Sequence, residues 1–414
     1  MSSTPSATSE GPAGHDPYQA LRHPEYRWFL LGIGALSMGT QIQTVALGWQ
    51  IYGLTGDPLS LGFVGLSEAL PFLALTLWGG HAADRMDRRS LCLLATLPIL
   101  GAGLWLLGAN LWGAPRSVWL FYGVQALAGA GRAFQRPAAQ ALGTELVPRE
   151  AYANAATWRS ALFHSTMVAG PALGGALVVF SPRLAYGVEG ALMLFSLATF
   201  LFVRPHPRPS SPSGEGRGLL DGVRYVLREK VVLGALSLDL FAVLFGGAPA
   251  LLPIFAKDIL MVGGLGFGLL RAAPAAGSIA MSLLLAHRPP LKRAGRTLLA
   301  CVAAFGACWI LFAVSKSFPL AMLLLVLSGA FDNVSMVLRA TLVQTFTPQA
   351  LMGRVAAVNS FFIGSSNEVG AFESGLAARL LGVVPSVVFG GCMTLAVVIA
   401  TAWRAPQLRK LDRI

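Results

Sequence analysis

Charged side chains are scarce in this sequence. Asp, Glu, Lys and Arg together make up 12% of its 414 residues, whereas soluble domains carry about 25%. Hydrophobic residues make up 55% of the chain, and its mean hydropathy is +0.63. This composition excludes an ordinary soluble domain and predicts a membrane protein.

Cysteine and histidine are also scarce, and neither is clustered. The six histidines are scattered along the chain, and the four cysteines all lie in apolar segments, at Cys92, Cys301, Cys308 and Cys392. These positions indicate packing thiols rather than a disulfide framework or a zinc site. The sequence shows no metal-ligand spacing, nucleophile motif or nucleotide-binding motif. We therefore expect no metal, no cofactor, no enzymatic activity and no ATP-driven pumping by this chain.

Long apolar segments are abundant. Crossing a bilayer core takes roughly 20 apolar residues in a helix. Five segments contain no Asp, Glu, Lys or Arg: Phe29–Gly56, Ser90–Pro115, Ser160–Pro182, Thr297–Ser315 and Leu380–Trp403. Seven more tolerate one or two ionisable residues, at about 59–82, 117–141, 186–203, 231–255, 264–286, 318–342 and 355–378. The sequence predicts an all-α membrane protein with twelve transmembrane helices.

The positive charge follows the predicted topology. A net charge of +12 could indicate a nucleic-acid partner, but 21 of the 31 Lys and Arg residues fall in the two tails and the even-numbered loops. The odd-numbered loops hold about four of them. Because cytoplasmic loops are enriched in Lys and Arg, this bias predicts that both termini are cytoplasmic. We expect the chain to lie in a lipid bilayer and to have no nucleic-acid partner.

Polar segments divide the chain. Residues 1–20 are rich in Ser, Pro, Gly and Thr and lack the pattern of a signal peptide, so we expect a disordered tail. Residues 204–218 form a polar linker, and Leu219–Lys230 has the pattern of an amphipathic helix lying on the inner leaflet. The predicted domains are a tail at 1–20, a six-helix half at 21–203, the linker with its helix at 204–230, a second half at 231–404 and a tail at 405–414.

The two halves look like copies related by a shift of 200 residues. The shift aligns the first span with the seventh and the fourth with the tenth. Identical residues recur at Gly129 and Gly329, Pro148 and Pro348, Ser160 and Ser360, Gly170 and Gly370, and Gly175 and Gly375. Parallel repeats of this kind are one architecture of membrane transporters.

A basic loop lies between the second and third spans. It reads Gly-His-Ala-Ala-Asp-Arg-Met-Asp-Arg-Arg over Gly80–Arg89. Gly80 is expected to permit close helix approach, and Asp84 to accept hydrogen bonds from neighbouring arginines or a helix end. The alternative is a basic anchor that only fixes topology. The gating candidates here are Gly80, Asp84, Arg85, Arg88 and Arg89.

A second motif lies inside the fifth span, where the chain reads Gly-Pro-Ala-Leu-Gly-Gly. Proline removes a backbone donor and bends a helix, while small residues let another helix pack closely. We expect a conformational role; the alternative is ordinary small-residue packing. The candidates are Gly170, Pro171, Gly174 and Gly175.

These two motifs resemble signatures of the major facilitator superfamily, and the second is associated with its exporters. The segments Gln50–Gly56, Leu146–Pro148 and Gly353–Val355 resemble its branch of enterobactin exporters and macrolide-efflux proteins. Asp87 stands where the superfamily usually has glycine, so the geometry of that turn is in question. The resemblance implies two pseudo-symmetric six-helix halves, alternating access and proton antiport in a monomer. It also implies export of a siderophore or drug-like molecule across a bacterial cytoplasmic (inner) membrane.

Ionisable groups inside a bilayer are costly and usually line a cavity or pair with each other. Arg132 and Asp332 occupy equivalent positions in spans that face the central cavity in the fold implied by the resemblance. We expect them to interact across it, directly or through substrate, so that protonation of Asp332 favours one state. The alternatives are a static pair, or a bond that each makes within its own half.

The remaining candidates follow from the same reasoning. Proton-coupling candidates are Asp332, Asp239, Glu368, Glu373 and Glu68. Glu368 and Glu373 are five residues apart, about 140° around a helix, and are not expected to share a face. Candidates for the substrate cavity are Arg132, Gln41, Gln43, Phe134 and Arg339, with Trp49 and Trp158 as further aromatic surfaces.

Other classes of function compete with export. An importer or uniporter of a nutrient or lipid in the same fold is the main alternative. A membrane enzyme would need clustered catalytic groups, which the scattered histidines do not supply. A receptor or scaffold would not need charges at matched positions of two repeats.

Overall fold

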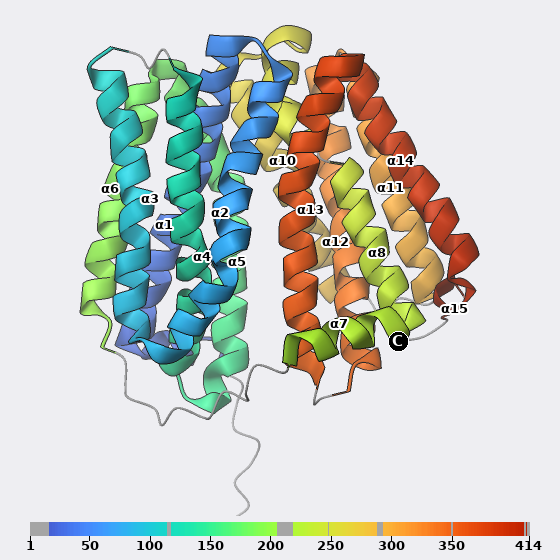
Figure 1. Ribbon diagram of the computed structural model, residues 1–414, viewed down its shortest axis with the longest axis horizontal. Helices are drawn as coiled ribbons and strands as arrows, with labels where there is room; N and C mark the ends of the chain where they lie inside the picture. Colours follow the sequence, from blue (N-terminus) through green and yellow to red (C-terminus); the bar gives the residue numbers. More distant parts are fainter. Residues whose placement is uncertain are drawn as a thin grey trace, which may run out of the picture.

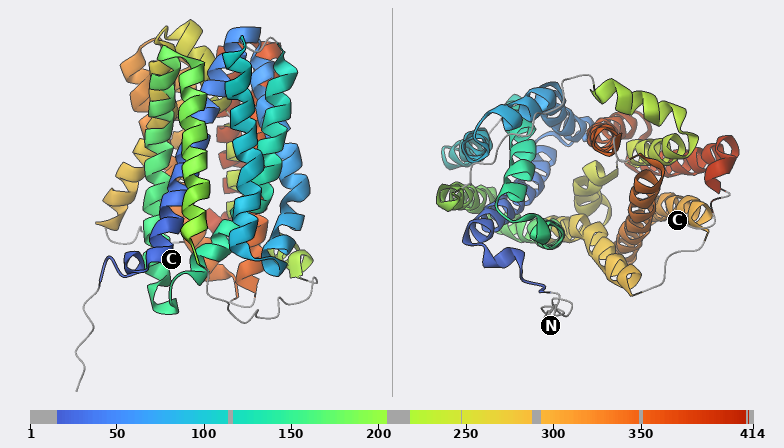
Figure 2. Two further views of the ribbon diagram at one scale, coloured as in Figure 1. Left: turned by 90° about the vertical axis from the view of Figure 1, so that its left-hand side faces the viewer. Right: turned by 90° about the horizontal axis from the view of Figure 1, so that it is seen from below.

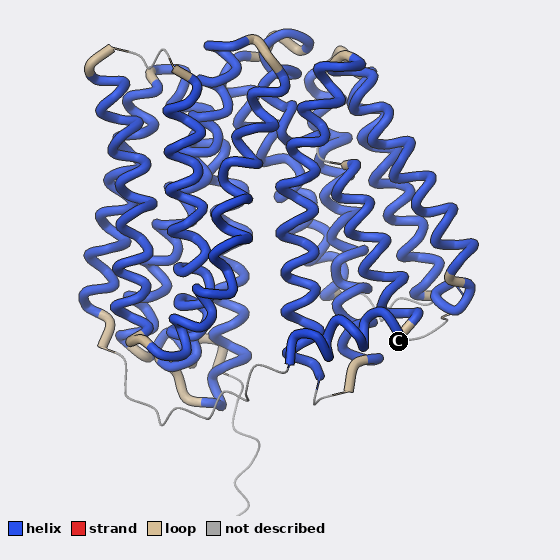
Figure 3. The backbone as a smooth tube through the Cα atoms, viewed as in Figure 1, coloured by secondary structure: helices blue, strands red, loops and turns tan. Residues whose placement is uncertain are grey.

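The computed structural model describes residues 16–113, 117–204, 218–246, 248–287, 293–348, 351–409 and 411. Within these ranges every regular element is a helix, and most of the non-helical segments lie at the two ends of the molecule (Figure 3). The prediction of an all-α fold is confirmed for this part of the chain.

Six long helices form an N-terminal bundle. They follow a short 3₁₀ helix, η1 (Ala20–Arg22), and η2 (Arg149–Ala151) precedes the fifth of them. The six are α1 (Pro24–Thr55), α2 (Pro58–Arg85), α3 (Arg88–Leu111), α4 (Val118–Glu145), α5 (Tyr152–Phe180) and α6 (Pro182–Phe202). Figure 1 shows them in blue to green.

The C-terminal bundle repeats this plan after a short helix, α7 (Gly218–Arg228). It consists of α8 (Lys230–Phe245), η3 (Ala248–Leu251), α9 (Leu252–Ile254), η4 (Phe255–Ile259), α10 (Gly263–Ala286), α11 (Ala294–Val314), α12 (Phe318–Phe346), α13 (Met352–Leu381), α14 (Val383–Arg404) and α15 (Pro406–Arg409). Seen from below, the two bundles lie side by side (Figure 2).

The helices are long enough to cross a bilayer. In the described ranges, ten segments are both long and apolar enough to do so. Helices α4 and α13, of 28 and 30 residues, are as long but more polar. The prediction of twelve spans fits this arrangement.

The predicted span at 231–255 lies within a candidate membrane span, Lys230–Ile259, which is divided into several short helices rather than formed by one. Helix α8 ends at Phe245, and the chain continues through η3, α9 and the π-helical turn η4. Pro249 and Pro253 lack a backbone N–H and cannot continue the ladder of helix hydrogen bonds. The break turns the chain over the end of the bundle, where η4 contacts α1.

The end of the predicted disordered tail is ordered. Residues 16–20, assigned above to a disordered tail, form a turn that leads into η1. The side chain of Asn154 on α5 accepts a hydrogen bond from the Ala20 amide (2.9 Å) and donates one to the Pro17 carbonyl (2.7 Å). Trp158 also donates to that carbonyl (3.0 Å), so it anchors the tail rather than offering an aromatic surface to a substrate.

The two bundles join at one end. We call the end that carries residues 203–204 and α7 the linker end, at the bottom of Figure 1, and the opposite one the far end. The largest buried apolar cluster combines both bundles at the far end; it includes Leu47, Ile51 and Tyr52 of the N-terminal bundle with Phe255, Phe267 and Leu270 of the C-terminal one. Toward the linker end, one cluster holds only N-terminal residues, such as Phe29 and Leu142, and another only C-terminal ones, such as Leu298 and Leu342. Among the described residues, the apolar cluster that joins the two bundles therefore lies at the far end.

Glycines allow the closest helix crossings within each bundle. On α12, a Cβ atom added to Gly329 would overlap the carbonyl oxygen of Pro274 on α10. A Cβ atom at Gly277 on α10 would likewise overlap the carbonyl of Val326 on α12. Small residues at both positions let the two backbones touch, which is how helices associate where no hydrophobic driving force is available.

We expect Gly329→Ala to destabilise the protein by about 1–3 kcal/mol, because the added methyl forces α10 and α12 apart. Thermal unfolding in detergent would measure this as a lower melting temperature. Gly123→Ala on α4 is the matched control: no atom lies within 4 Å of its Cβ position. Equal melting temperatures for the two variants would contradict this view of the crossing.

Candidate functional site

A buried ion pair lies inside the N-terminal bundle. The Arg132 guanidinium on α4 pairs with the Glu68 carboxylate on α2, and their side chains are 10% and 17% exposed. Gln125, two turns before Arg132, donates a hydrogen bond from Nε2 to the second oxygen of Glu68 (3.0 Å). Gly129 lets α4 lie directly on the Glu68 backbone, since a Cβ there would overlap the Glu68 carbonyl. The close crossing of α2 and α4 thus positions the pair.

A second buried pair lies inside the C-terminal bundle. The Arg339 guanidinium on α12 pairs with the Asp239 carboxylate on α8, and the side chains are 10% and 9% exposed. Charge-assisted pairing of this kind offsets the cost of holding ionised groups away from water. Each bundle therefore neutralises one of its own arginines.

Arg132 and Asp332, expected to interact directly or through substrate, make no direct contact in the described state. Arg132 bonds to Glu68 within its own bundle. Asp332 is partly exposed and has no hydrogen-bond or ion-pair partner among the described residues. A carboxylate on the adjacent helix α2 pairs with Arg132 without any contribution from the other bundle. This is the second alternative named above for Arg132.

The uncharged cavity candidates are not gathered into one site. Gln41 donates to the Met167 sulfur on α5 (2.7 Å), and Gln43 is 1% exposed with no hydrogen-bond partner in the described ranges. Phe134 lies where α4 crosses α2. Trp49 stacks on Phe267 of the other bundle, with ring centroids 6.1 Å apart.

Two acidic candidates lie outside the described side chains: the carboxyls of Asp84 and Glu368. Glu373 is partly buried on α13. The structure therefore brings together Glu68 with Arg132, and Asp239 with Arg339, and it leaves Asp332 apart from both pairs.

The arginines of the basic loop hold neighbouring helix ends. Arg88 pairs with Glu145 at the end of α4 (2.5 Å) and also donates to the Ala83 carbonyl (3.4 Å). Arg89 donates to the last carbonyls of α6, at Phe200 (3.0 Å) and Leu201 (2.7 Å). Cations at a helix C-terminus satisfy unpaired carbonyls and complement the helix dipole. The loop thus ties α2 and α3 to α4 and α6 at the linker end, while Arg85 is exposed.

Two residues of that loop behave differently from the sequence-based expectation. Gly80 faces open space, and its neighbour Gly79 makes the close approach, against the Ala133 carbonyl on α4. Asp87, which replaces the usual glycine, caps α3: its carboxylate accepts a hydrogen bond from the Ser90 amide (2.8 Å). An acidic N-cap satisfies backbone donors that a glycine would leave to water.

The motif of the fifth span faces two ways. Gly170 packs on Gln41 of α1, within the same bundle. A Cβ atom added to Gly170 would lie 2.5 Å from the Gln41 Cβ. Gly175 packs on α10 of the other bundle, where an added Cβ atom would lie 2.6 Å from the Gly264 carbonyl oxygen. Gly174 also faces α1, at Ile42. The motif thus sits at the seam between the bundles.

The repeat shows the same arrangement 200 residues later. Gly370 on α13 packs on the Leu244 carbonyl of α8 (2.7 Å), and Gly375 packs on the Gly62 Cα of α2 (2.9 Å). Like its counterpart, the first glycine of this pair faces the first helix of its own bundle and the second faces the other bundle. The matching positions are what a repeated six-helix unit predicts.

Polar contacts add to the apolar seal at the far end. The Tyr52 hydroxyl on α1 donates to the Asp258 carboxylate on η4, and the Lys257 ammonium lies over the Tyr52 ring (5.4 Å). Arg379 on α13 lies 3.5 Å from Asp57, the N-cap of α2. These contacts link the two bundles, and those of Lys257 and Asp258 depend on the break after α8, which the sequence did not predict.

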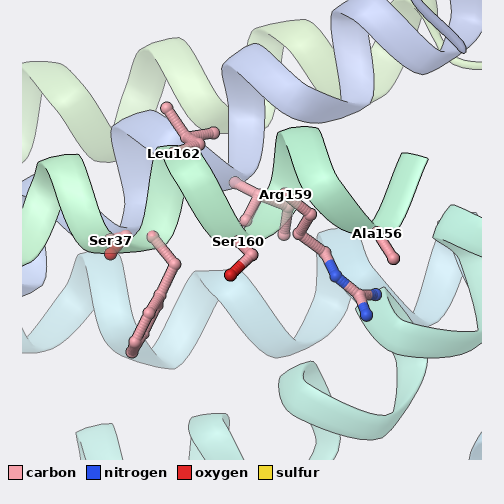
Figure 4. A pocket seen from close by; sticks show the side chains of 7 residues that line it. Ser37, Ala156, Arg159, Ser160 and Leu162 are labelled. Carbon is pink, nitrogen blue, oxygen red and sulfur yellow. The ribbon is translucent and has the colours of Figure 1, made fainter. Parts of the chain in front are cut away.

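A pocket of about 290 Å³ opens between α1 and α5. Figure 4 shows Ser37 on α1 with Arg159 and Ser160 on α5. The wall is completed by Ile33, Ala156, Leu162 and Phe163. The pocket offers a cation and two hydroxyls beside apolar surface, which suits an amphiphilic ligand. Sequence reasoning missed it, because only the packing of α1 on α5 brings these residues together.

Sequence reasoning also missed Glu189. This residue lies on α6 inside a predicted span, and its side chain is fully buried. The available signal was the acid itself, within the otherwise apolar segment 186–203.

The family described as "Transmembrane secretion effector" matches residues 15–414. The multidrug efflux pump Tap of Mycobacterium tuberculosis is 25% identical over 408 residues, covering 90% of this chain and 91% of the pump. The enterobactin exporter EntS of Escherichia coli is 28% identical over 400 residues, covering 91% of each chain.

Solved structures show the same fold at low identity. A peptide transporter of the POT family aligns with a TM-score of 0.74 and 13% identity, over 97% of this chain and 100% of that one. An inward-facing, occupied bacterial homologue of the lysosomal transporter Spinster aligns with a TM-score of 0.73 and 16% identity, over 97% and 99%.

We expect Asp239→Asn to cost about 3–5 kcal/mol of folding stability, because it leaves the Arg339 guanidinium buried without its carboxylate. The double variant Asp239→Asn with Arg339→Met should recover most of that loss, since neither charge remains. Thermal unfolding of the single and double variants measures the coupling. Additive losses would show that the pair does not act as a unit.

Proposed function

Because the chain belongs to the family of transmembrane secretion effectors, within the major facilitator superfamily, we propose that it exports a small organic molecule across the membrane in exchange for protons. The observation that carries the proposal is the seal between the bundles at the far end, together with separate apolar clusters toward the linker end. A molecule built this way can rock between two states about a site between its bundles.

The linker end is assigned to the cytoplasm of a bacterial inner membrane. The positive-inside bias places the linker, the basic loop and both tails there. The amphipathic helix α7 would then lie at the inner leaflet, with Val226 buried and Leu227 62% exposed. In this orientation the far-end seal closes the outer mouth, so the described state receives its substrate from the cytoplasm. The protein is proposed to act as a monomer.

Export rather than import is supported by the named relatives. Tap is named a multidrug efflux pump and EntS an enterobactin exporter. We therefore propose a drug-like compound or a catecholate siderophore as substrate. Import is the second candidate, because structural neighbours of 10% and 12% identity include a nucleoside transporter and a D-xylose–proton symporter. At such identities the likeness concerns the fold alone, so it does not set the direction.

Two carboxylates are proposed to couple protons to transport. Asp332 is partly exposed near the middle of α12, where water or substrate can reach it. Asp239 holds Arg339 in the described state. Protonation of Asp239 would remove the charge that holds Arg339 and would favour a rearrangement of α8 against α12. A substrate that displaces these protons would complete an antiport cycle.

The test is proton movement in proteoliposomes that contain the purified protein, under an imposed pH gradient. Enterobactin and a panel of cationic and macrolide drugs would be offered on each side. We expect substrate-dependent proton flux that is lost in Asp332→Asn or Asp239→Asn. Glu150→Gln, at an exposed carboxyl outside the bundles, is the matched control and should keep the flux.

Two results would contradict the proposal. Substrate movement without proton flux would indicate a uniporter or another driving ion. Substrate accumulation driven in the direction of the proton gradient would indicate an importer.

A further inference from the structure

Glu189 is the most deeply buried carboxyl that the proposed cycle does not use. Its side chain is 0% exposed. Neither carboxyl oxygen has a hydrogen-bond partner within the described part of the chain. The two ion pairs above show how this fold treats carboxylates that stay ionised: each is given an arginine. Glu189 is an exception.

The packing of three helices creates this site. Helix α6 lies against α1 and α3. Gly103 of α3 faces the carboxyl, and a Cβ there would overlap both carboxyl oxygens. Gly39 of α1 faces the Glu189 backbone, 3.4 Å from its Cβ position to the carbonyl oxygen. Gly103 therefore makes room for the carboxyl group and supplies no side chain to neutralise it, while Gly39 lets α1 approach the α6 backbone at the same residue.

Few ionisable groups face this carboxyl. From α4, the charge of Arg132 reaches it. On α6 itself, Tyr186 lies one turn away and donates its hydroxyl to Gln50 (3.0 Å) rather than to the carboxyl. From α3, Gly103 faces it. Arg132 is thus hydrogen-bonded to Glu68, and its positive charge also acts on Glu189 without a hydrogen bond.

The physical cost of this arrangement sets the protonation state. An ionised carboxylate held away from water without a partner is far more costly than a neutral carboxylic acid. While Arg132 is bonded to Glu68, the low-energy form of Glu189 is therefore the neutral acid. If Arg132 moved to Glu189, that carboxyl could ionise, and Glu68 would be left to take up the proton.

We propose that Glu189 is a proton-binding site, and that Glu68, Arg132 and Glu189 together hold one proton whose position Arg132 decides. The proposal rests on proton-driven transport as proposed above and assigns a site to it. In the described state the proton is on Glu189 and Glu68 is ionised. In the other state Arg132 pairs with Glu189, and the proton of Glu189 is transferred to Glu68, so the charge of the trio is unchanged. Glu68, whose side chain is 17% exposed, exchanges its proton with solvent, while Glu189 is closed to it.

Infrared spectroscopy of the purified full-length protein in lipid nanodiscs tests the site without any substrate. The carbonyl stretch of a neutral carboxylic acid is separate from the bands of carboxylates and amides. At neutral pH we expect one carboxylic acid band that Glu189→Gln removes. Glu150→Gln, the exposed control, should leave it unchanged. A band unaltered in Glu189→Gln would overturn the proposal.

A second variant tests the sharing of Arg132 and does not depend on the folding of Glu189→Gln. In Glu68→Gln the guanidinium of Arg132 loses its carboxylate, and Glu189 becomes the available partner. We expect the Glu189 band to disappear although Glu189 is present, because it ionises against Arg132. A band that persists in Glu68→Gln would show that the two carboxyls do not compete, and would overturn the sharing of one proton.

Proton flux separates this proposal from the proposed function. In proteoliposomes, Glu189→Gln should abolish substrate-dependent proton flux. If the unmodified protein moves substrate with no proton flux, the antiport function fails, while the infrared result still decides whether Glu189 binds a proton. If the unmodified protein shows coupled flux and Glu189→Gln keeps it in full, the role of Glu189 in coupling is wrong.

Discussion

The absence of water from the bilayer core is the constraint on which this structure depends. A polar group there must find its partner inside the protein, so the backbone closes its hydrogen bonds in helices. The same constraint places Arg132 against Glu68 and Arg339 against Asp239. Glu189 satisfies it in another way, because a carboxyl without a partner can avoid the cost of ionisation by holding a proton. Buried charge and bound proton are thus two solutions to one problem.

The two ends of the molecule are held by different forces. At the far end, apolar packing, glycine contacts between backbones and the Tyr52–Asp258 bond join the bundles. At the linker end, each bundle is braced internally, as by Arg88 and Arg89 in the N-terminal one. Contacts that cross the seam can be exchanged without unfolding either bundle. This division would allow each bundle to move as a unit in the alternating-access cycle proposed above.

Pairing within each bundle has a consequence for coupling. Had Arg132 bonded to Asp332, the tie would have locked the bundles together, and each cycle would have had to break a bond between buried charges. With Arg132 held by Glu68, the pairing can respond to a proton inside one bundle. Asp332 is then left outside both ion pairs.

The sequence by itself determined the helical membrane fold, since apolar segments of bilayer length form helices in lipid. The repeat was visible from matching residues such as Gly170 and Gly370. The sequence also indicated which ionisable residues lie at membrane depth. Tertiary structure alone decided their partners. Arg132 has Glu68 because Gly129 lets α2 and α4 touch, whereas Glu189 faces Gly103 and has no hydrogen-bond partner among the described residues. The break after α8 and the pocket at Arg159 likewise arise from packing. The hydrophobic pattern of the sequence indicates which residues are buried, but the packing of the helices decides which buried residues contact one another.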